Sequence, residues 1–276
     1  MKAHNNIDLP PDGKKKPLLH IVEENAVFVL LVLIVLLIVL EIILRFFSTG
    51  IPGSSDYVQH FVLWVALIGA MITTRKKEHL SLSVGLNAFK EPLKTIAQVS
   101  TSFVSVAVCT VLFFTSTRAI FTGFDPDKMV GIVPLRLFLL LLPAGFMVMA
   151  VRFALHAKGG IRARFIAFCG MIPGVFLSFT SILFFLQEIP FIFGLESAAV
   201  SDWAYDAYDV FIGFYDSFMA VFIWPGVVIL LAAALSGAPI FVVLAGIAIL
   251  LFSRSGLVLG DLTLEAYTVL TRYERS

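Results

Sequence analysis

The sequence predicts an all-α integral membrane protein with about seven transmembrane helices. Hydrophobic residues make up 59% of its 276 residues and charged residues only 14%, whereas a soluble domain carries about 25% charged residues. The mean hydropathy is correspondingly high, at +0.97. Charge is also missing from long continuous stretches, of which 26–40 is the clearest. A run of this composition and length is typical of a transmembrane helix.

The distribution of basic residues predicts the orientation of the helices. Lysines and arginines form short clusters beside the expected helix ends, at 14–16, at 75–77 and within 152–164. Such clusters mark cytoplasmic boundaries, so we expect these ends and the amino terminus on the cytoplasmic side. The net charge is only +1, and the clusters form no stripe of the kind that binds nucleic acid. Cys109 and Cys169 fall in apolar runs, which is typical of core thiols rather than of a disulfide.

The first predicted span covers about 24–44, after a polar cytoplasmic tail at 1–17. It is too long and too rich in Val and Ile for a signal-peptide core, and no small-residue cleavage site follows, so we expect it to be retained. Near its far end, Glu41 and Arg45 stand four residues apart. This spacing places both on one helix face, where they can pair and share the cost of burial. The alternative is a pair solvated at the membrane interface.

The second predicted span, about 57–74, carries Gly69 in its last third and ends at the basic cluster. The following segment, 75–94, has apolar residues every four positions, which is typical of an amphipathic helix lying along the membrane interface. Glu78 and His79 stand near its start. They are either a solvated helix end or part of a motif.

Two polar aromatic side chains fall inside the second span. Trp64 lies too far from either end to be an interfacial anchor, so we expect it to pack against other helices. His60 has no second His, Cys or acidic residue at metal-ligand spacing. We therefore expect a hydrogen-bonded histidine rather than a ligand.

Three further spans are predicted at about 96–117, 134–153 and 165–186. The first of them is rich in Ser and Thr, which permit close packing and hydrogen bonds between membrane helices. Residues 188–209 are acidic and aromatic and contain no Lys or Arg. We expect this segment to form an external, periplasmic loop.

The last part of the chain contains a sixth span at about 210–235 and a further apolar run at 240–252. Gly237 and Pro239 separate the two runs, because glycine and proline are the strongest breaks in a helical pattern.

Motifs for covalent, metal or nucleotide chemistry are absent from the sequence. It has no Walker lysine loop, so ATP is not expected to drive it, and neither a nucleophile elbow nor a His-Glu-x-x-His motif. Acidic residues are also missing from the middle of the predicted spans, where ion coupling would need them. The sequence therefore predicts neither an enzyme nor a protein with a cofactor.

Two stretches carry a family resemblance. In 67–84, a Gly-Ala pair late in an apolar helix is followed by basic residues and by Glu-His-Leu-x-Leu-x-Val. Residues 134–153 begin with Pro-Leu, continue through a leucine run and Pro-x-Gly-Phe, and end with Arg-Phe. Together with the pair formed by Glu41 and Arg45, these stretches resemble the small membrane subunit, DctQ type, of the tripartite ATP-independent periplasmic (TRAP) transporters. The resemblance covers about 18–156.

The C-terminal part resembles the start of the large, DctM-type subunit of the same transporters, in the break at 237–240 and in the segment 260–271. The chain is then either a fused small-plus-large protein cut early or an extended small subunit. We divide it into a cytoplasmic tail at 1–17, a four-helix small-subunit-like domain at 18–156, an extra span with an acidic periplasmic loop at 157–209, and helices resembling the large subunit at 210–276.

The resemblance implies a function and partners. The chain would be a scaffold in a secondary active transporter of organic acids, driven by a sodium or proton gradient in the bacterial inner membrane. It would bind a large permease subunit within the lipid bilayer and help to dock a periplasmic solute-binding protein. A structural role is expected for Glu41, Arg45, Gly69, Glu78, His79, Gly237 and Pro239. Substrate-binding residues are not assigned.

Other functions fit some of the same features. One alternative is a membrane-embedded enzyme or an assembly factor unrelated to transport, which would use Glu78 and His79 or the acidic loop. A self-sufficient channel is less consistent with the sequence, because the spans carry few polar stripes that could line a pore.

Overall fold

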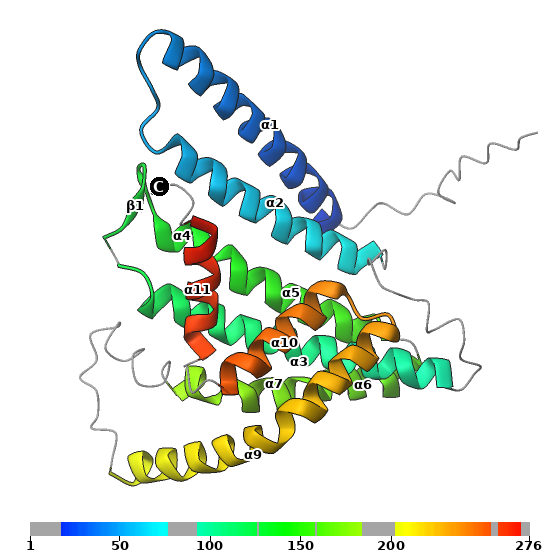
Figure 1. The fold of residues 1–276 in the computed structure, drawn as a ribbon. Helices are drawn as coiled ribbons and strands as arrows, with labels where there is room; N and C mark the ends of the chain where they lie inside the picture. Colours follow the sequence, from blue (N-terminus) through cyan, green and yellow to red (C-terminus); the bar gives the residue numbers. More distant parts are fainter. Residues whose placement is uncertain are drawn as a thin grey trace, which may run out of the picture.

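Figure 1 shows the fold in the computed structural model. The structure describes residues 18–76, 93–125, 127–157, 159–183, 202–254 and 259–271. The elements are α1 (Leu18–Phe46), α2 (Ser54–Lys76), α3 (Leu93–Thr122), β1 (Met129–Val130), β2 (Val133–Pro134), α4 (Leu135–Leu139), α5 (Leu141–Leu155), α6 (Gly160–Cys169), α7 (Met171–Leu177), α9 (Asp202–Leu235), α10 (Ile240–Arg254) and α11 (Leu259–Thr271).

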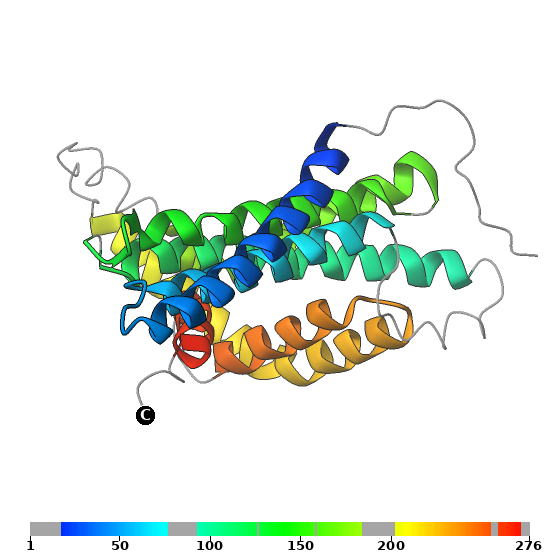
Figure 2. The same ribbon diagram turned by 90° about the horizontal axis from the view of Figure 1, so that it is seen from above.

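Helix α3 is the centre of the bundle. It contacts α4, α5, α6, α7, α9, α10 and α11, and Figure 2 shows it between α5 on one side and the α9–α10 pair on the other. Its residues Val106, Cys109 and Val111 are at most 1% exposed. By contrast, only 6% of the most apolar part of α1 is buried. We conclude that α1 presents most of its surface to lipid.

Six described segments are long and apolar enough to cross a membrane: α1, α2, α3, α4 with α5, α6 with α7, and α9. Helix α10 is also apolar but has 15 residues, which span about 22 Å and fall short of a hydrocarbon core about 30 Å thick. The prediction of an all-α membrane protein with about seven spans is therefore confirmed in outline. Several helices extend beyond the predicted spans, because a helix continues past the hydrocarbon into the headgroup region.

The fourth predicted span, 134–153, is confirmed as a candidate membrane span over Leu135–Leu155, although the helix is not uniform along its length. Pro134 belongs to β2, and the helix is divided at Leu140 into α4 and α5. The reason is Pro143, which has no N–H to donate to the carbonyl of Leu139 one turn earlier. Strands β1 and β2 pair antiparallel and form a short ribbon before α4. Tyr57 of α2 holds this ribbon, because its hydroxyl accepts a hydrogen bond of 3.1 Å from the backbone N–H of Ile132.

The fifth predicted span, 165–186, begins earlier than expected and is also divided, at Gly170, into α6 and α7. Figure 1 shows the two helices in line, since Gly170 itself stays in the right-handed helical region at φ −60° and ψ −18°. The break lies three residues before Pro173, again where a proline N–H is missing. Residues 184–186 lie outside the described part of the chain.

The acidic segment 188–209 is not a loop throughout. Helix α9 begins at Asp202, so residues 202–209 are helical, while 188–201 lie outside the described residues. Acidic residues suggested an aqueous loop, but polarity alone does not end a helix. Between Asp202 and Pro225 the sequence has no proline. The helix therefore extends beyond the apolar residues into the acidic segment.

The hydroxyl residues of α3 mostly bond to their own helix rather than to neighbouring helices. Thr110 donates to the carbonyl of Val106 at 2.8 Å and Thr117 to that of Phe113 at 2.6 Å. The expected hydrogen bonds between helices are few and long among the described residues. Two reach other helices or their connections from α3, at 3.4 and 3.5 Å, and join Thr101 to Ser236 and Thr115 to Thr263. The main contribution of these Ser and Thr side chains to packing is their small size, which lets neighbouring helices approach α3 closely.

Two glycines of the α6–α7 pair allow it to lie directly against α3. A Cβ atom on Gly170 would overlap the backbone carbonyl oxygen of Phe103, and one on Gly174 would lie 2.7 Å from the Cβ of Thr110. The spacing, Gly-x-x-x-Gly, is the one that brings the backbones of membrane helices together. The close packing of α6 and α7 on α3 thus requires glycine, with no side chain, at these two positions.

This packing predicts a strong effect of a single methyl group. We expect Gly170→Ala to destabilise the protein by about 1–3 kcal/mol, because the backbone atoms that it meets cannot move aside. Gly213→Ala is the matched control, since a Cβ there meets nothing within 4 Å. Thermal unfolding in mild detergent compares the two. Equal melting temperatures would show that α6 and α7 are not seated as described.

Candidate functional site

A buried ionic network joins three helices where the amino-terminal end of α1 meets the carboxyl-terminal ends of α2 and α5. Arg152 of α5 binds the carboxylate of Glu23 on α1 and donates a second hydrogen bond of 2.7 Å to the carbonyl of Met71 on α2. Arg75 of α2 pairs with the same Glu23 at 3.2 Å and with Glu24 at 2.5 Å. Two carboxylates and two guanidinium groups therefore bridge the three helices.

Little of this network is accessible. Glu23 is 4% exposed and Arg152 is 7% exposed, and the side chain of Arg75 is 10% exposed. Charges withdrawn from water cost several kcal/mol each unless they are paired and hydrogen-bonded. The network therefore restricts the three helices to one arrangement, because displacing any of them leaves a buried charge without its partner.

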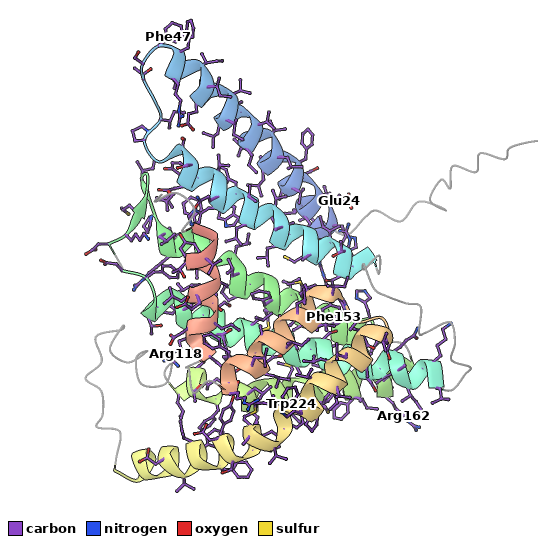
Figure 3. The ribbon with its side chains drawn as sticks, in the orientation of Figure 1. Glu24, Phe47, Arg118, Phe153, Arg162 and Trp224 are labelled. Atoms are coloured by element: carbon purple, nitrogen blue, oxygen red, sulfur yellow. The ribbon has the colours of Figure 1, made fainter. Side chains whose placement is uncertain are left out.

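The local sequence places the two arginines of the network where their helices favour a positive charge. Glu23 and Glu24 lie near the amino-terminal end of α1, whereas Arg75 and Arg152 lie in the last turns of α2 and α5. The helix dipole stabilises cations in the last turn of a helix, which favours both arginines, whereas the two glutamates lie beyond the first turn of α1. The labelled Glu24 in Figure 3 marks this end of α1, next to the end of α2.

Sequence reasoning missed this network. It read Arg75 and Arg152 as marks of the membrane boundary, and Glu23 fell outside the predicted first span. The available signal was an acidic pair directly before an apolar run, in a chain with two arginines at the ends of later apolar helices. That signal does not say which helix ends meet, so the partners follow only from the packing.

The pair that the sequence did predict lies at the opposite end of α1. Arg45 contacts Glu41 at 2.7 Å, and Glu41 also accepts a hydrogen bond from Ser54, at the start of α2. The side chain of Arg45 is 75% exposed and that of Glu41 is 21% exposed. The contact is present, with Ser54 as an unpredicted third partner. A role for the pair in holding helices stays a prediction.

The break between α9 and α10 contains a glycine whose backbone lies in the left-handed region. Gly237 has φ +92°, and its N–H bonds to Ala234 at 3.0 Å while that of Ala238 bonds to Ala233 at 2.8 Å. These two bonds form a Schellman motif, in which glycine is the preferred residue. Pro239 then accepts the first hydrogen bonds of α10, from Val242 and Val243.

The remaining predicted site residues are not brought into a common site. Gly69 lies in α2, but a Cβ there would meet nothing within 4 Å, so no described helix packs closely on it. Glu78 and His79 lie outside the described residues. Within the described part of the chain, no group of three His, Cys, Asp or Glu side chains could hold a metal ion.

His60 and Trp64 both make contacts inside the protein, as predicted. His60 is 3% exposed; its Nδ1 lies 2.6 Å from the carbonyl of Asp56 and its Nε2 3.2 Å from the hydroxyl of Tyr267. Because a carbonyl only accepts, the ring donates from Nδ1 to Asp56, and Nε2 faces the Tyr267 hydroxyl. Burial, and then the charge of Asp56, raises the pKa of Tyr267 to about 12. Trp64 donates to the carbonyl of Phe138 at 2.7 Å.

The C-terminal part of α1 and all of α2, α3, α4 and α5 lie within a segment that matches a known family. Residues 34–163 match the family described as tripartite ATP-independent periplasmic transporters, DctQ component. Residues 34–163 are a DctQ domain. The domain begins inside α1 and ends inside α6. No curated protein and no solved structure matches the chain.

The match confirms the predicted small-subunit family for residues 34–163, and the DctQ family is a membrane component of TRAP transporters. The DctQ family is a transporter component and not an enzyme family, and it works with a DctM subunit and a solute-binding protein in the lipid bilayer. The match ends at residue 163, so the resemblance of the C-terminal part to the large subunit stays a prediction.

The buried network predicts a large difference between two arginines. We expect Arg152→Met to destabilise the protein by about 3 kcal/mol or more, because Glu23 then keeps a buried charge without its closest partner. Arg45→Met, the control on an exposed pair, should cost at most about 1 kcal/mol. Thermal unfolding in detergent measures both.

A double-mutant cycle separates the charge interaction from general damage. Glu23→Gln combined with Arg152→Met should cost less than the sum of the two single changes, since each removes the other's unpaired charge. Strictly additive losses would contradict a functioning ion pair between α1 and α5.

Proposed function

We propose that the chain is the scaffold component of a TRAP transporter for organic acids in the bacterial inner membrane. Its task would be to enlarge and anchor the transport core of a large permease subunit and to help dock a periplasmic solute-binding protein. The observation that carries the proposal is the DctQ domain at 34–163, with three helices fixed by the buried network. A rigid body of this kind suits a stationary partner of a moving carrier.

The described helices favour a scaffold over a carrier. In secondary carriers, substrate and ions bind at broken helices whose unwound backbone faces a polar cavity near the middle of the membrane. The two divisions inside described spans, at Leu140 and Gly170, both keep helical backbone angles, and Gly170 is also pressed against α3. They leave no unwound backbone for an ion.

The end of the protein opposite the basic clusters supports the docking role. By the positive-inside rule, that end would face the periplasm. It carries Phe46 and Phe47 after α1, and Met129 and Ile132 in the ribbon, with exposures of 87%, 69%, 55% and 88%. Aromatic residues and methionine are enriched in interfaces between proteins, so this apolar end is where we place the solute-binding protein.

The C-terminal helices pack on the DctQ domain. Helix α11 contacts α3, and Tyr267 bonds to His60 across the chain. This contact supports a continuous body in which 210–276 extends the small-subunit-like domain 18–156. It suits both remaining alternatives, a fused small-plus-large protein and an extended small subunit.

A reconstitution experiment tests the proposed function. Liposomes that hold this chain alone should take up no labelled organic acid under a sodium gradient, because alternating access needs a moving substrate site. Uptake should appear when a large permease subunit and a solute-binding protein are added. Liposomes with those two proteins but without this chain are the control. Uptake by the chain alone, or equal uptake without it, would contradict the scaffold role.

The proposed orientation can be tested with single cysteines. In a variant without Cys109 and Cys169, Thr49→Cys should react with a membrane-impermeant maleimide in intact spheroplasts, because the α1–α2 turn faces the periplasm. Arg164→Cys should react only after the membrane is permeabilised. Labelling of position 164 from outside would invert the arrangement.

A further inference from the structure

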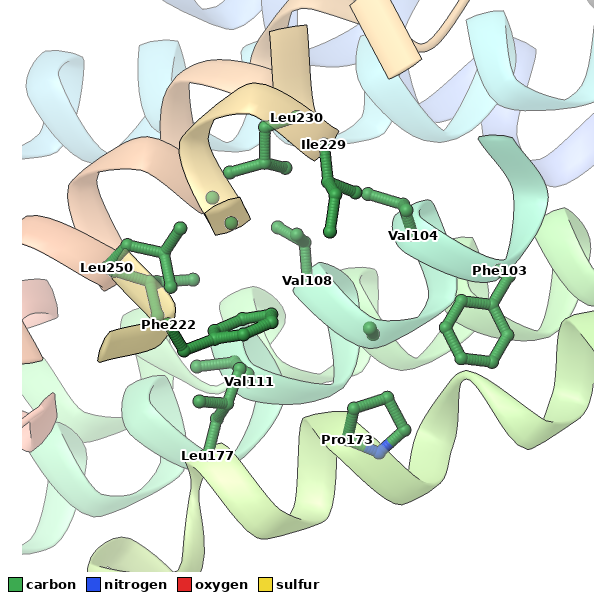
Figure 4. Close-up of a pocket in the computed structure, with 14 residues that line it drawn as sticks. Phe103, Val104, Val108, Val111, Pro173, Leu177, Phe222, Ile229, Leu230 and Leu250 are labelled. Atoms are coloured by element: carbon green, nitrogen blue, oxygen red, sulfur yellow. The ribbon is translucent and has the colours of Figure 1, made fainter. Parts of the chain in front are cut away.

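An apolar cavity lies between α3 of the DctQ domain, α7 and the C-terminal helices α9 and α10. Figure 4 shows side chains of α3, α7, α9 and α10 that line it. It holds about 650 Å³ of space, part of it open to the outside. Val104 and Val108 of α3, Pro173 and Leu177 of α7, Ile229 of α9 and Leu250 of α10 are among the residues that line it.

The lining determines what can fill the cavity. Its side chains are Phe, Val, Ala, Pro, Leu and Ile, with two glycines, so it offers no partner to a polar ligand, and burying unpaired polar groups is costly. Apolar cavities likewise stay dry and take up hydrocarbon. Since α3, α7 and α9 belong to candidate membrane spans, the hydrocarbon at hand is a lipid acyl chain.

One face of α6 and α7 leads from the cavity to a positive charge. Gly170 and Gly174 point at α3, whereas Arg162, Ile166 and Pro173 share the neighbouring face, because residues three, four or seven positions apart lie above one another on a helix. Ile166 is 51% exposed and Arg162 is exposed. An exposed apolar path therefore connects the guanidinium group with the cavity.

The length of this path matches one leaflet of a bilayer. Arg162 and Pro173 are eleven residues apart, which corresponds to about 16 Å along a helix. Half of the hydrocarbon core measures about 15 Å. Figure 3 places Arg162 at the far end of α6, beside the first turns of α3. When Arg162 lies at the headgroup level, the cavity lies where the ends of the acyl chains are.

The exposed guanidinium group of Arg162 can be reached by an anion. Among the ion pairs of the described residues, none involves Arg162. Basic residues at the ends of membrane helices are the usual partners of anionic lipid headgroups. We propose that this chain binds an anionic phospholipid, with its phosphate on Arg162 and one acyl chain in the cavity between α3, α7, α9 and α10.

Such a lipid would join the two parts of the chain. Its acyl chain would contact α3 and α7 on one side and α9 and α10 on the other, beside the place where Phe176 of α7 packs against the aromatic rings of α9. The lipid would thus complete the packing between the DctQ domain and the C-terminal helices.

Native mass spectrometry of the purified full chain tests the proposal. After delipidation in detergent, the chain is titrated with dioleoylphosphatidylglycerol, which is anionic, and in parallel with dioleoylphosphatidylcholine, which is zwitterionic. We expect the first to bind more tightly. Arg162→Gln should weaken it about fivefold, the factor that corresponds to about 1 kcal/mol for one basic residue.

The control for the charge lies two residues away. Arg164 is also exposed but points to the opposite side of α6, because two positions turn a helix by about 200°. Arg164→Gln should leave the affinity for phosphatidylglycerol unchanged. Equal losses in the two variants would overturn the site and indicate general attraction of a basic surface.

The acyl-chain half of the site is tested separately. Val104→Phe fills the cavity and should lower the affinity for both lipids, whereas Ile96→Phe, on an exposed position of α3 outside the lining, should not. Far-ultraviolet circular dichroism and gel filtration show whether each variant is folded. If inorganic phosphate displaces the lipid, or if wild type binds both lipids equally, the proposal is wrong.

Discussion

The arrangement of α1, α2 and α5 depends on one buried interaction, the contact of Arg152 with Glu23. Helix α1 offers its neighbours little apolar packing, since most of its surface is exposed to lipid, and lipid gives no hydrophobic drive for helices to associate. A charge pair inside the apolar region supplies what packing does not. The same guanidinium group holds the carbonyl of Met71, so the ends of α1, α2 and α5 are set by a single side chain.

Around this fixed end, the bundle is organised by small residues. Gly170 and Gly174 admit the backbone of α3, and the Ser and Thr side chains of α3 turn back to their own carbonyls. Both features let helices approach closely without a network of polar contacts. The ion pairs therefore determine which helix ends are in contact, and the small residues determine how closely α6 and α7 pack against α3.

The sequence predicted the class, the family and the approximate spans because these depend on composition and local pattern. It also predicted the contact of Glu41 with Arg45, because both lie on one helix. It did not predict Glu23 with Arg152, since that contact depends on how separate helices are placed. The divisions at Leu140 and Gly170 each precede a proline that the sequence displays, but a proline in a membrane helix is often accommodated without a break.

The unequal lengths of α9 and α10 have a consequence for the surrounding bilayer. The 34 residues of α9 extend about 51 Å, whereas α10 falls about 8 Å short of a hydrocarbon core about 30 Å thick. Lipids beside such a pair meet a hydrophobic mismatch, which is relieved by tilting the long helix and thinning the membrane around the short one. On the side of α10, the aqueous boundary is drawn inward toward Arg254, and the low-dielectric barrier there is thinner than elsewhere around the protein.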